Sequence, residues 1–130
     1  MADYTILSID DDESARVLFE IMLKRSGFNV LQAVDGDEAL SIVDSTIPDL
    51  IMTDIQLPGI NGIELVAEFR KREELDQTAI IVLSAFQSES MIDDAKSAGA
   101  DEFYKKPLKM DALSQRLIEI INRRRNLDNA

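Results

Sequence analysis

The sequence contains no cysteine, no histidine and no tryptophan among its 130 residues. Without cysteine there is no disulfide, no thiol nucleophile and no thiolate metal ligand. Without histidine the chain lacks the commonest general base and transition-metal ligand, which excludes a Ser-His-Asp hydrolase mechanism. Chemistry by this chain must therefore use carboxylates, lysine, hydroxyl groups and backbone amides.

Long apolar runs and positive charge are also scarce. The longest apolar run, Ala79 to Leu83, is far shorter than the roughly 20 residues that a membrane span needs. The N-terminus has neither the basic region nor the apolar core of an export signal, so we expect a cytoplasmic protein without membrane contact. The chain has 14 Lys and Arg against 25 Asp and Glu, a formal net charge of −11, which argues against direct binding to nucleic acid.

Short apolar runs alternate with segments of helical spacing. Five β-rich runs begin near Tyr4, Phe28, Asp49, Thr78 and Asp101. Between and after them, apolar residues recur at i, i+3 and i+4, which predicts one apolar stripe per helix. The five stripes are Val17, Leu18, Ile21 and Met22; Ala39, Leu40 and Val43; Leu65, Val66 and Phe69; Met91, Ile92 and Ala95; and Leu113, Leu117, Ile120 and Ile121. The alternation predicts an α/β fold of the doubly wound (βα)5 type, with a five-stranded parallel sheet covered on both faces.

Helix boundaries are marked by capping residues. Asn61 and Glu64 have the spacing of a capping box, and Gly27 and Gly99 stand where helices need a left-handed C-terminal residue. The last helix is expected to begin near Lys109, which is a poor N-cap.

Polar residues follow the strands at one predicted edge of the sheet, where ligands bind in doubly wound folds. They are Asp10, Asp11 and Asp12 after the first strand, Asp54 after the third, Ser84 after the fourth, and Lys105, Lys106 and Pro107 after the fifth. Each alone has an ordinary interpretation as a cap, turn or terminator, and we expect Asp12 to cap the following helix. Their joint occurrence at four strand ends predicts a site.

The charges of these residues indicate what the site would bind. Two carboxylates about 4 Å apart repel by about 4 kcal/mol at an effective dielectric constant near 20, so clustered carboxylates would either raise each other's pKa values or recruit a cation. With oxygen ligands only, Mg²⁺ fits best, and it readily shares phosphate oxygens. A lysine and a hydroxyl facing it suggest a phosphoryl group as the shared ligand. A carboxylate can then act as the nucleophile and form an aspartyl phosphate.

Four local motifs carry a resemblance to a known family. They are ILSIDDDES, DLIMTDIQLPGING, IIVLSA and GADEFYKKPL. In this order and at these separations, they make the sequence resemble the receiver domain of two-component response regulators over essentially its whole length. The resemblance implies a flavodoxin-like sheet with strand order 2-1-3-4-5, a receiver domain over residues 1–125 and a C-terminal tail over residues 126–130.

The resemblance also implies the chemistry of the acidic residues. Asp54 would accept a phosphoryl group from a phosphohistidine of a sensor histidine kinase or a histidine phosphotransfer protein. Asp11 would bind Mg²⁺ directly and Asp10 mostly through water, with Asp54 and the backbone carbonyl of Gln56 completing the protein ligands. The domain would be a signalling domain, and not an enzyme beyond its own phosphorylation and dephosphorylation.

Three further positions would contact the phosphoryl group. The resemblance implies that the Ser84 hydroxyl and the Ala85 backbone amide bind its oxygens. Lys106 would pair with the acyl phosphate, and the peptide bond between Lys106 and Pro107 would be cis.

Signal output is expected to start from Ser84, which would move toward the phosphoryl group and vacate space for an aromatic residue. That residue is Phe103, where the family more often has tyrosine. Because phenylalanine has no hydroxyl to hold it in water, we predict that Phe103 is biased inward even before phosphorylation. Gln56 and Phe86 would flank the path of the hydrolytic water, and bulky Phe86 predicts a long phosphoryl lifetime.

Effector contacts would lie on the face made by the fourth helix, the fifth strand and the fifth helix. Cations expected on this face are Lys105, Lys109, Arg116 and the run Arg123–Arg125. The arginine run also fits a second interpretation, in which cations offset the dipole at a helix C-terminus.

Two other functions compete with the receiver hypothesis. A small haloacid-dehalogenase-like Mg²⁺ phosphatase would use Asp10 as the nucleophile within an Asp-x-Asp motif that includes Asp12. A receiver-like scaffold would signal without phosphate. Within the receiver hypothesis, the sequence leaves open a chemotaxis-type regulator, a phosphorelay shuttle and a part of a longer protein.

Overall fold

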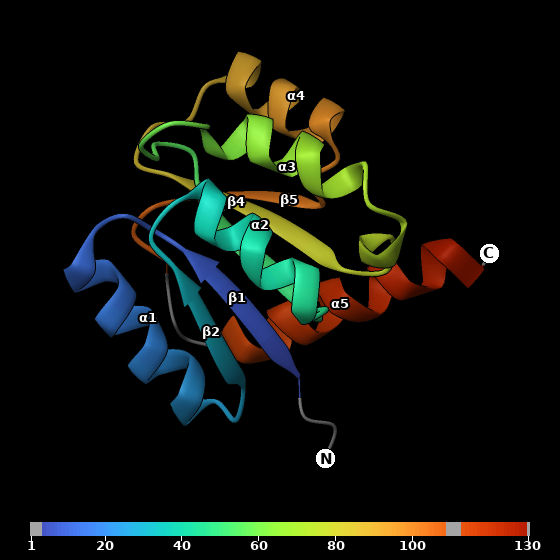
Figure 1. Ribbon diagram of the computed structural model, residues 1–130, viewed down its shortest axis with the longest axis horizontal. Coiled ribbons are helices and arrows are strands. Elements are labelled where there is room, and N and C mark those ends of the chain that lie inside the picture. The colour runs from blue at the N-terminus through green and yellow to red at the C-terminus, as the bar shows by residue number, and fades with distance from the viewer. Residues whose placement is uncertain (1–3, 109–112, 130) are drawn as a thin grey trace.

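The computed structural model describes residues 4–108 and 113–129, the last three of them as backbone alone, and folds into a parallel sheet between two layers of helices (Figure 1). The elements are β1 (Thr5–Ile9), α1 (Glu13–Arg25), β2 (Asn29–Ala33), α2 (Gly36–Ser45), β3 (Leu50–Asp54), α3 (Gly62–Arg70), the 3₁₀ helix η1 (Glu73–Leu75), β4 (Ala79–Ser84), α4 (Glu89–Ala98), β5 (Glu102–Lys105) and α5 (Leu113–Asn129). The strand order is β2-β1-β3-β4-β5, which confirms the predicted fold class.

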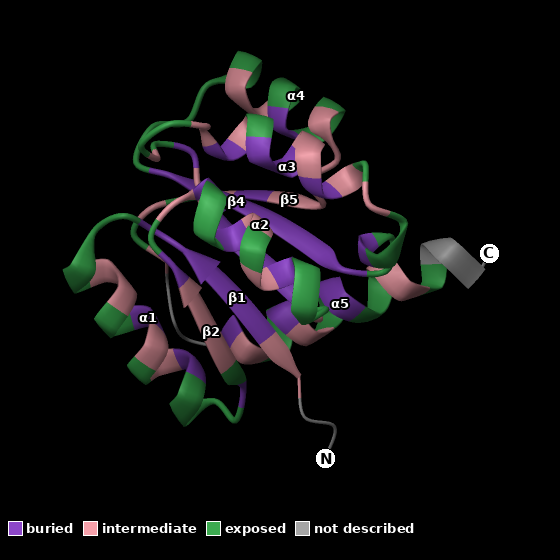
Figure 2. Ribbon diagram, in the orientation of Figure 1, coloured by how far each residue is buried: buried purple, intermediate pink, exposed green. Residues whose placement is uncertain are grey.

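The sheet separates two apolar cores. One core packs α2, α3 and α4 on one face, and the other packs α1 and α5 on the opposite face. Strand β4, the central run AIIVLS, is buried along its whole length, and Figure 2 shows this burial across the middle of the sheet. Within the described part of the chain, no helix is both long enough and apolar enough to cross a membrane.

The predicted caps are present. Asn61 and Glu64 form a capping box at the start of α3, and Gly27 and Gly99 have φ angles of 94° and 118° behind α1 and α4. Only glycine adopts this left-handed region without steric cost. The expected helix start near Lys109 lies outside the described residues.

The predicted stripe of α1 is wrong. Val17, Leu18 and Ile21 are exposed by 52%, 55% and 47%, whereas Phe19 and Leu23 are buried against the sheet. The helix carries apolar residues around much of its circumference, so i, i+3, i+4 spacing fits two different stripes. The stripe with the large Phe19 side chain faces the core, and the other faces solvent.

The arginine run of α5 does not lie at a helix end, so the dipole interpretation is wrong. Helix α5 continues to Asn129, and all three arginines pair with acidic residues near the amino ends of the strands. Arg123 pairs with Glu102, Arg124 with Asp101, and Arg125 with Asp49. The run therefore ties α5 to the sheet, because these carboxylates face it.

A buried ion pair joins α3 to the turn before β5. Arg70 donates to Asp101 at 3.0 Å, and the two side chains are only 12% and 8% exposed. Arg70 also donates to the carbonyls of Leu75, Thr78 and Gly99. This network holds the amino end of the sheet, opposite the edge that carries the predicted site.

Candidate functional site

Three carboxylates gather at the carboxyl ends of β1 and β3. Asp10 and Asp11 follow β1, and Asp54 is the last residue of β3. The two strands are parallel neighbours, with Ile9 opposite Thr53, so their carboxyl ends meet at the same edge. One oxygen from each carboxylate lies within 4.8 Å of the others. Asp10 is buried, Asp54 is half-buried and Asp11 is exposed, which leaves the cluster open to solvent on one side.

Lys106 reaches this cluster from the end of β5. Its Nζ donates to Asp10 Oδ2 at 2.9 Å and to Asp54 Oδ2 at 3.1 Å. Burial acts to lower the pKa of Lys106, but hydrogen bonds to Asp10 and Asp54 and the charges of both carboxylates raise the pKa above its ordinary value. The ammonium group is therefore charged at neutral pH and offsets the repulsion between the carboxylates.

Asp12 does not join the cluster. Its carboxylate accepts from the backbone N–H of Ala15 at 2.9 Å and caps α1, as the sequence predicts. Its own N–H donates to Asp10 Oδ1 at 2.9 Å. Asp12 therefore helps to orient Asp10 while its carboxylate serves the helix.

Ser84 ends β4, the neighbour of β3, and is 1% exposed. Its hydroxyl oxygen accepts from the backbone N–H of Phe86 at 3.1 Å, and its carbonyl accepts from the N–H of Lys106 at 2.7 Å. The bond between Lys106 and Pro107 is cis, as the resemblance implies. Ala85 is exposed, and Phe86 is exposed by 66%.

The loop after Asp54 approaches the site through its backbone. The N–H of Gln56 lies 3.4 Å from Asp54 Oδ1. A Cβ on Gly62 would lie 2.2 Å from the carbonyl oxygen of Asp54, so only glycine fits at this position. The spacing from Asp54 to Gly62 belongs to the motif DLIMTDIQLPGING, and this close approach is its physical reason.

Phe103 is buried in the core beneath α3 and α4, on the side of the sheet away from α5. Its neighbour Tyr104 faces the other way, and Tyr104 Oη accepts from Arg116 Nε at 3.0 Å. The two aromatic residues thus point to opposite faces, as expected for successive strand residues. The predicted inward bias of Phe103 before phosphorylation stays a prediction.

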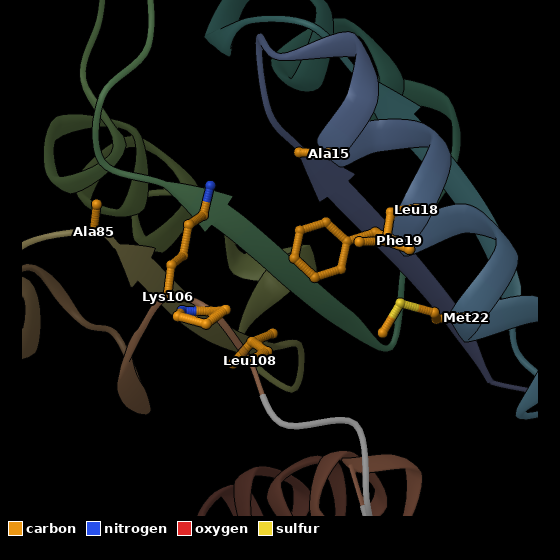
Figure 3. A pocket seen from close by; sticks show the side chains of 8 residues that line it. Ala15, Leu18, Phe19, Met22, Ala85, Lys106 and Leu108 are labelled. Carbon is orange, nitrogen blue, oxygen red and sulfur yellow. The ribbon is translucent and has the colours of Figure 1, made fainter.

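A pocket of about 420 Å³ adjoins the site and was missed by sequence analysis. Figure 3 shows Leu18, Phe19 and Met22 of α1 on one side and Lys106 and Leu108 on the other. The lining also includes Ala15, Ala85 and Pro107. The surplus apolar residues of α1 are the sequence signal that could have indicated this surface.

The donor set fits magnesium. Asp10, Asp11 and Asp54 offer oxygen atoms only, and one or two carboxylates with several waters is the usual arrangement for Mg²⁺. A carboxylate that contacts a lysine ammonium, on a strand whose neighbour ends in the buried Ser84, also suits attack on phosphorus, because phosphoryl transfer depends mainly on positioning and charge stabilisation.

Comparisons with known proteins agree with this geometry. Sporulation initiation phosphotransferase F of Bacillus subtilis is 31% identical over 113 residues, which cover 87% of this chain and 90% of that protein. Transcriptional regulatory protein AfsQ1 of Streptomyces coelicolor is 33% identical over 97% of this chain, but the chain spans only 56% of its length. The chain spans about half of the curated transcriptional regulators it matches.

A solved structure of a receiver domain also resembles this chain. The receiver domain of the sensor histidine kinase PA1611 from Pseudomonas aeruginosa PAO1, with a magnesium ion coordinated in its active-site cleft, is 27% identical with a TM-score of 0.84 over 93% of this chain and 99% of that chain. The profile of the response regulator receiver domain matches residues 6–118. This chain belongs to the family of response regulator receiver domains.

Proposed function

We propose that this chain accepts a phosphoryl group on the carboxylate of Asp54 from a phosphohistidine of a partner protein. The observation that carries the proposal is the position of Lys106, whose ammonium group contacts both Asp10 and Asp54. Three strand ends thus bring together the carboxylate that would be the nucleophile, a carboxylate that would bind metal, and a cation. Receiver domains are signalling domains, and the phosphoryl group is the signal that they receive.

The transfer needs no general base, because a carboxylate is already deprotonated. An Asp54 oxygen would form a bond to phosphorus as the bond between phosphorus and the imidazole nitrogen breaks. The imidazole leaves with the electron pair of that bond, and it is neutral after transfer when its other ring nitrogen carries a proton, because a ring without that proton would leave as the imidazolate anion. Lys106 would stabilise the charge on the transferring oxygens, as in other phosphoryl transfers. The hydroxyl of Ser84 and the N–H of Ala85 would bind two of those oxygens.

The acidic residues would hold Mg²⁺, which receiver domains bind at the corresponding cluster of carboxylates. The ligands would be Asp11, Asp10 mostly through water, Asp54 and the backbone carbonyl of Gln56. When bound, the ion supplies positive charge to the phosphoryl oxygens and offsets their repulsion from the carboxylates.

The partner that donates the phosphoryl group must place its phosphohistidine next to Asp54. Leu18 of α1 is exposed and lines the apolar pocket beside Lys106, whose Nζ contacts that carboxylate, and Val17 and Ile21 extend the apolar surface of the same helix. An apolar surface of this kind suits protein docking, so we place the phosphodonor here. For the effector we retain the face of α4, β5 and α5, on which Lys105 is exposed and Arg116 pairs with Glu102.

The phosphatase alternative is not favoured, because its second aspartate, Asp12, caps α1. Two routes for the signal after phosphorylation can be tested: transfer of the phosphoryl group to a further protein, and control of a longer protein of which this domain is a part. The likeness to a phosphotransferase over 90% of its length supports transfer to a further protein, and the likeness to longer transcriptional regulators supports a role as the receiver of a longer protein.

The test is phosphorylation by acetyl phosphate with Mg²⁺, followed by the intact mass. The wild type should gain one phosphoryl group, and Asp54→Asn should gain none. Asp12→Asn is the matched control, because asparagine also caps helices, and it should behave as the wild type. A gain that survives Asp54→Asn but is lost with Asp10→Asn would contradict the proposal. No gain by the wild type from acetyl phosphate or from a phosphorylated histidine kinase would also contradict it and favour a scaffold.

A further inference from the structure

The polar groups of Asp10 are all held by partners. Its N–H donates to the carbonyl of Ala33 at 3.2 Å. Its carboxylate accepts from the Asp12 N–H and from Lys106. Its carbonyl oxygen accepts from Arg16 Nη1 at 2.9 Å, in a half-buried position. The last contact has no part in the proposed phosphoryl transfer.

Arg16 is itself fixed by two backbone contacts. Its N–H donates to the carbonyl of Asp12 at 3.0 Å, within the first turn of α1. Its carbonyl accepts from Gln32 Nε2 of β2 at 2.6 Å. Gln32 stands opposite Ser8 in the β1–β2 register. A series of hydrogen bonds therefore connects β2 through α1 to the loop that carries Asp10 and Asp11.

We propose that Arg16 is a positioning residue of the metal site, with Gln32 as its support. The carbonyl of Asp10 and the N–H of Asp11 belong to one planar peptide group. A guanidinium that holds this carbonyl therefore also fixes the Asp11 N–H, and with it the direction in which the Asp11 side chain projects from the backbone. Asp11 is exposed and accepts no side-chain hydrogen bond from the described residues, so this peptide group is what orients it. The inference rests on the proposed function, because it concerns the same Mg²⁺ site.

The charge of Arg16 and its hydrogen bond to the Asp10 carbonyl predict opposite changes in Mg²⁺ affinity when Arg16 is replaced. A guanidinium beside three carboxylates repels an incoming cation, so loss of its charge alone would tighten Mg²⁺ binding. Loss of its hydrogen bond would release the peptide between Asp10 and Asp11 and weaken binding. The sign of the change in Mg²⁺ affinity thus separates the two roles.

The experiment measures the Mg²⁺ dissociation constant by isothermal titration calorimetry for the wild type, Arg16→Met, Gln32→Met and Arg25→Met. Partners that orient metal ligands affect affinity by 10-fold to 100-fold, so we expect about 10-fold weaker binding for Arg16→Met and a smaller weakening for Gln32→Met. Arg25→Met is the matched control. It removes one positive charge from the same helix, where Arg25 is exposed and forms no hydrogen bond or ion pair with the described residues, and its affinity should equal that of the wild type.

A second measurement uses the metal-free protein. Hydrogen exchange at the Asp12 amide, which donates to Asp10 Oδ1, should be faster in Arg16→Met and Gln32→Met than in Arg25→Met. Mg²⁺ binding by Arg16→Met that is equal to or tighter than that of the wild type would overturn the inference. Should Arg16→Met fail to fold, unchanged affinity in Gln32→Met would overturn it instead. A wild type that binds no Mg²⁺ would overturn the proposed metal site itself, which is a different result.

Discussion

Replacing Lys106 with methionine removes the ammonium group that contacts both Asp10 and Asp54. At 2.9 and 3.1 Å, each contact has a gross Coulomb energy of about 5 kcal/mol at an effective dielectric constant near 20. Desolvation offsets much of this attraction. Breaking a buried pair costs about 3–5 kcal/mol, and because the Lys106 side chain is 24% exposed, we expect the metal-free variant to lose about 3 kcal/mol of unfolding free energy, at the low end.

Magnesium should reverse much of this loss. The ion would bind the carboxylates that the ammonium contacts, so the variant binds it without competition from Lys106. A ligand at 100 times its dissociation constant stabilises a protein by about 2.7 kcal/mol, and the stabilisation should be larger in Lys106→Met than in the wild type. The difference in stability between the two proteins should therefore shrink when Mg²⁺ is added.

Urea unfolding followed by circular dichroism measures this difference with a chelator and with saturating Mg²⁺. Lys105→Met is the matched control, because Lys105 is exposed and its side chain pairs with none of the described residues. Its stability should follow that of the wild type in both conditions. A deficit in Lys106→Met that is the same with and without Mg²⁺ would refute the idea that ion and ammonium share the carboxylates.

Three further predictions concern other parts of the fold. Arg70→Met leaves the Asp101 carboxylate with less compensation and should lower the unfolding free energy by about 3 kcal/mol; a change near zero in urea unfolding would show that the buried pair contributes little. Phe103 should occupy the same inward rotamer in crystals with and without a phosphoryl mimic, and an ordered outward Phe103 in the unphosphorylated protein would contradict this bias. Phe86→Ala should shorten the lifetime of the phosphoryl group, measured as loss of bound phosphate over time, because it opens the path for water; an unchanged lifetime would remove Phe86 from that role.

The sheet and most of the site could be predicted from the sequence because they depend on local pattern and on one topological rule. Strand runs such as AIIVLS are apolar on both faces, which is typical of a central parallel strand. Once the strands are parallel, Asp10, Asp54 and Lys106 must meet at one edge. The cap by Asp12 and the turns at Gly27 and Gly99 follow from the chemistry of single residues.

Features that depend on how elements distant in the sequence pack together could not be predicted. Helix α1 has two apolar stripes, and only packing against the sheet decides that Phe19 faces inward while Val17 and Leu18 face solvent. The arginines of α5 pair with carboxylates distant in sequence, such as Asp49 and Asp101, which no local spacing reveals. The pocket beside Lys106 depends on how α1 packs against the sheet, because side chains of α1 line it.

The most direct test of the account is to locate the phosphoryl group. An acyl phosphate on an aspartate is reduced by borohydride to homoserine, so phosphorylated protein can be reduced, digested and sequenced by mass spectrometry. The account predicts homoserine at position 54 and unmodified aspartate at positions 10, 11 and 12. Homoserine at position 10 with intact Asp54 would contradict it.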